Sequence, residues 1–246
     1  MKKICFLIGL SGLITVTAVQ AQMQITLTQN PPNFPYSYGV GGEFNALANA
    51  SLLTVNPTLS GYSAATADGT SFETFCVETM EEFTPGNTYN VDISQGIKFN
   101  GEQFSPPDGG ALTLGVAWLY SQFAAGTLGS YDYSNDGGRQ QSAGNLQNAL
   151  WYMEGEITSL NSSAVNSGAD GTTFYNEALA AVGANINNAS DGAYGVVVLN
   201  TYVPNEDGSD GASAQDQLMV VPEPTSLALA SLGGLAVLLL RPKRKL

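Results

Sequence analysis

Histidine is absent from this chain of 246 residues, and only two cysteines, Cys5 and Cys76, are present. Without histidine, neither a Ser-His-Asp nor a Cys-His catalytic arrangement can be assembled. Two cysteines also fall short of a structural zinc site, and the chain has no glycine-rich phosphate loop of the GxxxxGK[ST] type. The sequence therefore predicts no metal centre and no bound cofactor.

Positive charge is scarce between the two ends of the chain. Residues 22–221 carry 20 acidic and 2 basic side chains, a net charge of 2 − 20 = −18, and the two basic residues are Lys98 and Arg139. Such a surface repels phosphate backbones and anionic lipid, so nucleic-acid binding is excluded. The chain is 43% hydrophobic, which is enough to bury a core of moderate size.

Residues 1–21 have the layout of a secretory signal peptide. Lys2 and Lys3 precede an apolar run, and small residues lead up to a cleavage position after Ala21. An uncleaved anchor is less favoured, because the run is short and is not followed by charged residues. Cleavage removes Cys5 and leaves Cys76 as the lone cysteine of an exported protein, where an unpaired thiol needs an explanation.

The C-terminal segment 221–246 has three parts. Residues 227–240 are uncharged and span about 21 Å as a helix, which predicts a short transmembrane helix. The positive-inside rule keeps the basic end of the chain in the cytoplasm. The preceding tetrapeptide consists of Val221, Pro222, Glu223 and Pro224, and the basic cluster consists of Arg241, Lys243, Arg244 and Lys245.

This segment resembles the PEP-CTERM sorting signal, which combines such a tetrapeptide with a short apolar helix and an arginine-led basic cluster. The resemblance implies that an exosortase, a membrane protease, removes the tail. The body would then be released or attached at the surface of a Gram-negative bacterium that produces exopolysaccharide. A permanent single-pass anchor is the alternative interpretation.

Residues 22–220 are expected to form a single extracellular domain of the α+β class. Stretches rich in β-branched and aromatic residues predict strands over 23–29, 71–79, 87–93, 194–203 and 216–221. Apolar residues spaced three and four apart predict about three helices, over 111–126, 139–156 and 172–186.

Two groups of acidic residues have weak functional signatures. Asp132, Ser134 and Asp136 are spaced like the start of a calcium-binding EF-hand loop, but Ala143 stands where that loop needs glutamate, so a solvated turn is favoured. The candidates for a carbohydrate hydrolase are Glu78, Glu81 and Glu82, together with Glu154 and Glu156. This third class is the least favoured, because close carboxylate pairs arise readily by chance in so acidic a chain.

Cys76 belongs to one of three short motifs that occur in order along residues 22–220. They are "FCV" at 75–77, "LQNALW" at 146–151 and "AQDQL" at 214–218. Together they resemble the motifs of thioester domains in bacterial surface adhesins. The resemblance implies an internal thioester between Cys76 and Gln215, with Gln217 as the competing partner. It also implies a pocket shaped by Gln147 and Trp151, with Phe75 and Trp151 shielding the bond from water.

A thioester carbonyl is a latent electrophile that an amine-bearing surface or matrix molecule can capture as a stable amide. The reaction happens once per molecule, so the protein is not expected to be an enzyme. The bond also explains an unpaired cysteine outside the cell, because an acylated sulfur neither pairs nor oxidises easily. The alternative is a non-reactive structural component of the exopolysaccharide or biofilm matrix in which Cys76 only packs. If the thioester forms, the strands around Cys76 and Gln215 lie side by side, with the 146–151 helix nearby.

Overall fold

The structure is a computed structural model that describes residues 21–29, 37–55, 70–98, 110–134, 136–163 and 168–221. The expected signal helix and the expected transmembrane helix lie outside the described residues, as do the basic cluster and the sorting tetrapeptide after Val221. Among the described helices, none combines the length and the apolar character that crossing a bilayer requires.

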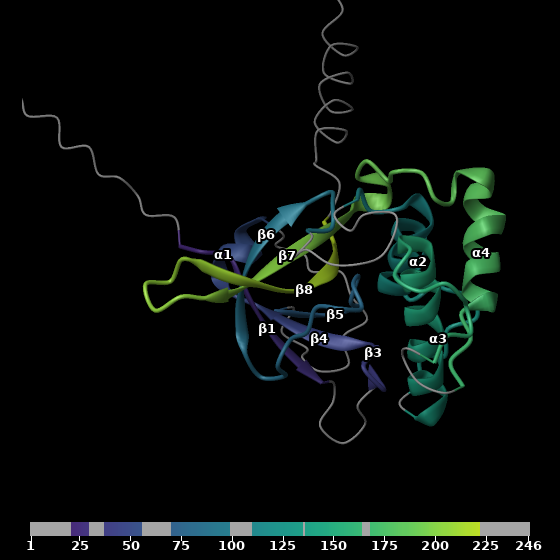
Figure 1. Cartoon of the computed structure of the whole chain (residues 1–246), viewed down its shortest axis with the longest axis horizontal. Coiled ribbons are helices and arrows are strands. Elements are labelled where there is room, and N and C mark those ends of the chain that lie inside the picture. The colour runs from purple at the N-terminus through teal and green to yellow at the C-terminus, as the bar shows by residue number, and fades with distance from the viewer. Residues whose placement is uncertain are drawn as a thin grey trace, which may run out of the picture.

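The described elements mix strands and helices (Figure 1), which confirms the α+β expectation. The strands are β1 (Gln24–Gln29), β2 (Ser37–Tyr38), β3 (Gly41–Gly42), β4 (Phe44–Ala48), β5 (Ser71–Thr74), β6 (Thr88–Ser94), β7 (Val196–Pro204) and β8 (Asp210–Val220). The helices are α1 (Ala50–Val55), α2 (Leu114–Ala124), α3 (Gly137–Glu154) and α4 (Thr172–Val182), with short 3₁₀ turns at η1 (Gly183–Asn185) and η2 (Ala193–Gly195).

Six strands form one antiparallel sheet in the order β5-β4-β1-β6-β7-β8. The two edge strands of this sheet, β5 and β8, also meet. The residues that follow β5 run antiparallel to β8, where Val77 N donates to Asp216 O at 3.1 Å and Leu218 N donates to Phe75 O at 3.3 Å. The sheet therefore curls until its edges pair, which removes the exposed edges that an open sheet would leave.

The closed sheet has an apolar cluster on each face. All six strands contribute to the inner cluster, which includes Ile25, Phe72, Val91 and Met219, and Leu52 of α1 joins it. The outer cluster packs β7 and β8 against α2, α3 and α4, which stand together on one side of the sheet (Figure 1). Strand alternation explains the division, because successive side chains point to opposite faces.

The three predicted helices correspond to α2, α3 and α4, and the predicted strands correspond to β1, β5, β6, β7 and β8. Strand β8 begins at Asp210, six residues before the predicted start, because the β7 ladder supplies hydrogen bonds to a segment whose Gly, Ala and Ser content favours turns. Helix α1 and the two-residue strand β2 were not predicted. Sequence propensity is a weak guide for such short elements, which depend on the neighbours that they pack against.

Candidate functional site

Cys76 lies directly opposite Gln217, in the region where the sheet closes. The hydrogen bonds of Val77 and Leu218 flank this pair on either side, so Cys76 and Gln217 form a non-hydrogen-bonded pair. Side chains approach most closely at such positions of an antiparallel ladder. The predicted proximity of the two strand motifs is therefore confirmed, across a sequence separation of 141 residues.

The side chains of this pair are in contact and fully buried. Gln217 Nε2 lies 3.7 Å from Cys76 Sγ and also donates to the carbonyl oxygen of Gln215 at 3.2 Å. Both Cys76 and Gln217 have no exposed surface. Within the described residues, the buried oxygen Oε1 of Gln217 has no hydrogen-bond donor, and leaving such a group unpaired costs about 1–3 kcal/mol.

Helix α3 covers Cys76 with two residues of the predicted helical motif. Gln147 Nε2 donates to the carbonyl oxygen of Cys76 at 2.7 Å, and Gln147 Oε1 accepts from Gly42 N at 3.2 Å. Trp151 lies one helical turn later and packs in the same apolar cluster as Cys76. Gly41 has to lack a side chain, because a Cβ there would lie 2.7 Å from Gln147 Cγ and 3.0 Å from Trp151.

Phe75 lies away from this cluster. Its ring belongs to the outer apolar cluster and meets Phe123 edge-on, with centroids 4.9 Å apart. Successive residues of an extended chain point in opposite directions, so Phe75 cannot share the surroundings of Cys76. Phe44, at the start of strand β4, instead joins Trp151 beside Cys76.

The structure places Gln217 beside Cys76 and directs Gln215 elsewhere, unlike the sequence interpretation that gave Gln215 first place. Gln215 Nε2 donates to the carbonyl oxygen of Glu78 at 2.7 Å. The register explains the difference, since pairing Cys76 with Gln217 sets Glu78 across from Gln215. Strand β8 also shifts register against β7 between Leu199 and Thr201, where it contains an additional residue.

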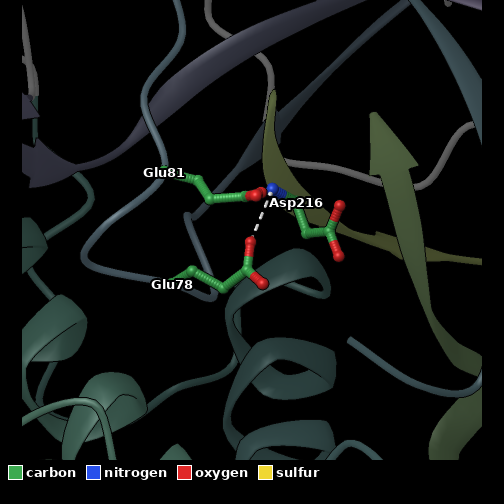
Figure 2. Close-up of side chains that lie close together, drawn as sticks. All are labelled: Glu78, Glu81 and Asp216. Carbon is green, nitrogen blue, oxygen red and sulfur yellow. Dashed lines mark hydrogen bonds between the residues drawn. The ribbon is translucent and has the colours of Figure 1, made fainter. Parts of the chain in front are cut away.

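Three carboxylates gather next to this pair: Glu78, Glu81 and Asp216, shown in Figure 2. In the described part of the chain they are the one group of three acidic residues in which one carboxylate oxygen from each lies within 4.8 Å of the other two. Glu78 accepts a hydrogen bond from Asp216 N at 3.4 Å (Figure 2). The sequence grouped Glu78 with Glu81 but could not add Asp216, which comes from a strand 138 residues away from Glu78.

Burial governs the protonation of these groups. It raises the pKa of Glu78 well above its ordinary value, and the neighbouring charges of Asp216 and Glu81 raise it further. Burial also raises the pKa of Asp216, although its carboxylate accepts from Lys98 N, Asn200 Nδ2 and Thr201 N. The pKa of the Cys76 thiol is raised for the same reason, so the sulfur is a neutral thiol near pH 7.

The three carboxylates offer oxygen ligands of the kind that hard cations prefer. However, the Asp216 oxygens already accept three hydrogen bonds, and the raised pKa of Glu78 favours its neutral form, which is a poor ligand. The arrangement is better suited to holding and passing a proton beside Cys76 than to binding a metal ion.

The other acidic candidates have structural roles. Glu154 Oε1 accepts from the backbone and hydroxyl of Thr113, the N-cap of α2, and Glu156 Oε2 accepts from the backbone and hydroxyl of Thr79. The two carboxylates thus hold two different segments in place. Asp136 Oδ1 caps the N-terminus of α3 by accepting from Gly138 N at 2.8 Å, and Asp132 Oδ1 accepts from Ser134 N at 2.9 Å, as in a turn.

Comparison with known proteins concerns the C-terminal end. No curated protein and no solved structure matches the chain, so the resemblance of residues 22–220 to adhesin thioester domains gains no support. Residues 220–245 match the family model described as the PEP-CTERM protein-sorting motif, the segment that the sequence resemblance indicated. By this motif the chain is an exosortase substrate that is exported, held in the membrane before cleavage and then brought to the cell surface.

Proposed function

We propose that the body of this exported protein attaches covalently, once per molecule, to an amine-bearing surface or matrix molecule through an internal thioester between Cys76 and Gln217. The observation that carries the proposal is the 3.7 Å contact between Gln217 Nε2 and Cys76 Sγ, in a buried pair. Because the two reacting side chains are already in contact, the bond would form in an intramolecular reaction, which needs no encounter between two molecules.

The bond would form by attack of Cys76 Sγ on the side-chain carbonyl carbon of Gln217. The carbon–nitrogen bond of the amide breaks, the thiol proton passes to the nitrogen, and ammonia leaves. Glu78, two residues from Cys76 and raised in pKa, is suited to relay that proton.

The residues around Cys76 favour this mechanism, which needs no histidine. Trp151 and Phe44 pack around Cys76 and exclude water, which is the competing nucleophile. Later capture by an amine would return the thiol to Cys76 and leave a new amide on the side chain of residue 217. The attachment then persists without metal or cofactor.

The experiment is intact-mass measurement of the freshly purified body. The wild type is expected to be lighter than its sequence by one molecule of ammonia, because thioester formation expels it. Cys76→Ser and Gln217→Ala should each restore the full mass, whereas Gln215→Ala should keep the deficit. Full mass in the wild type, with a thiol that titrates one to one and no amine adduct, would disprove the thioester.

A non-reactive matrix component is the second candidate, and the complete burial of Cys76 favours it. An inert core thiol shows full sequence mass, and its replacement by alanine costs about 1 kcal/mol or more through lost packing. The mass measurement separates the two candidates, while leaving the sorting motif unaffected.

Processing of the tail is a separate prediction. In its native host the mature protein should lack the segment from about Leu227 onward, because the sorting motif marks the tail for removal by an exosortase. Mass spectrometry of the surface fraction would show this, and Glu223→Ala should leave the tail in place, while the matched change Glu206→Ala in the β7–β8 turn should not. Recovery of wild-type chains intact to Leu246 in washed membranes would instead support a permanent anchor.

A further inference from the structure

A pocket of about 290 Å³ opens on the loop that follows Cys76. Its lining includes Thr79, Glu81, Glu82 and Phe83 of this loop, together with Phe44 and Gln215. Cys76 and Gln217 do not line it and have no exposed surface. The pocket therefore lies next to the buried Cys76–Gln217 pair, on the side of this loop that faces solvent.

The pocket is built for a small organic cation. Glu82 is exposed, so one wall carries a carboxylate, while Phe44, Phe83 and Pro85 supply apolar surface. The oxygens of Glu81 are buried beside Glu78 and Asp216, so this acidic group lies behind the wall. An exposed carboxylate with aromatic surface beside it favours an ammonium group on an alkyl chain.

Two aromatic rings separate the pocket from the thiol. Phe44 and Phe83 meet edge-on, with centroids 4.8 Å apart and an interplanar angle of 88°. Both rings line the pocket, and both belong to the cluster that contains Cys76 and Trp151. Phe83 is only partly buried and lies on a loop without regular structure, so its ring is the one with room to move.

We propose that this pocket receives the primary amine of the attachment partner, as the ammonium end of a lysine side chain or an alkyl diamine, with Phe83 controlling its passage to Cys76. The proposal rests on the proposed thioester for its chemical outcome. The ammonium would give one proton to a pocket carboxylate. The neutral amine then attacks the acyl carbon at position 217, its second proton passes to the departing sulfur of Cys76, and an amide forms.

Binding is tested without the reaction, in the Cys76→Ala variant. Titration with butylamine, followed by NMR of the Gln215 side-chain amide, should show saturable shifts, and butanol should show none. The double change Glu81→Gln and Glu82→Gln should weaken butylamine binding by about tenfold, as expected for loss of charge-assisted hydrogen bonds. The matched control Glu206→Gln should leave it unchanged.

The role of Phe83 in the passage of the amine to Cys76 is tested in protein that retains Cys76 and Gln217. Phe83→Ala should give a severalfold faster appearance of the butylamine adduct in intact-mass spectra than the wild type. Equal binding of butylamine and butanol, or binding that survives the double glutamine change, would overturn the pocket assignment whatever Cys76 does. If binding follows the expected pattern but the wild type keeps its full mass, the thioester fails and the ammonium site stands.

Discussion

Replacing Arg139 with methionine is expected to lower the free energy of unfolding by about 3–5 kcal/mol, because the change strands a buried carboxylate. Arg139 and Glu43 form an ion pair with no exposed side-chain surface. Arg139 Nε donates to Glu43 Oε2 at 3.0 Å, and the Tyr131 hydroxyl donates to the same oxygen at 2.5 Å. Without the guanidinium, Glu43 keeps its charge in the core or must take up a proton.

The position of Arg139 in the first turn of α3 supports a structural role for its ion pair with Glu43. It is the third residue of α3, near the positive end of the helix dipole, where a cation is unfavourable by itself. The pair with Glu43 offsets that cost and ties α3 to the segment that leads into β4. Arg139 is one of the two basic residues between positions 22 and 221, so in this acidic protein a substitute partner for Glu43 is hard to find.

Urea denaturation of the single and double variants measures this effect. Glu43→Leu alone should destabilise the protein to a similar degree, and Arg139→Met with Glu43→Leu should cost much less than the sum, since no charge is then left unpaired. Lys98→Met, at the other basic residue, should cost less than about 1 kcal/mol because Lys98 is exposed. Additive effects at Arg139 and Glu43 would contradict this account of the pair.

Mild acid is expected to stabilise the protein, by about 2 kcal/mol between pH 7 and pH 5. Burial raises the pKa of Glu78 and of Asp216, and it raises the pKa of Glu154 to about 7. Between the ordinary carboxyl pKa and neutral pH, the folded state therefore binds more protons than the unfolded state. Stability then rises as the pH falls through this window.

The opposite trend should begin only at lower pH. Hydrogen bonds from neighbouring side chains and backbone lower the pKa values of the exposed Asp136, Asp170 and Asp207, so their contribution is lost as the pH falls below the ordinary aspartate value. Denaturation midpoints from pH 4 to pH 8 would show the profile. Glu78→Gln and Asp216→Asn should each flatten it, and Glu206→Gln should not. A midpoint that falls steadily from pH 7 to pH 5 would contradict the assignment.

Much of the fold could be predicted from local pattern. The spacing of Leu146, Leu150 and Met153 indicated α3, whose buried face includes all three. The β-branched runs indicated five strands, whereas the five residues of β4 carry too little periodicity for its bounds to be recognised. No pattern in the sequence assigned a role to Phe44 or Glu43, which complete the surroundings of Cys76 and Arg139.

Two properties of this protein could be determined from its sequence alone. They are its export to the cell surface and the exclusion of catalytic arrangements that need histidine. Its C-terminal motif matches a sorting signal because such a signal is a contiguous stretch, read by a protease from neighbouring residues. The absence of histidine is likewise a matter of counting. Both conclusions stand without any knowledge of packing.

Only the tertiary structure decided which residues meet. The sequence motif favoured Gln215 over Gln217 as the partner of Cys76. The pairing register of two strands instead places Gln217 on Cys76 and turns Gln215 toward Glu78. The same register brings Asp216 to Glu78 and Glu81. A register is set by hydrogen bonds and core packing along the whole length of the strands, so no short motif contains it.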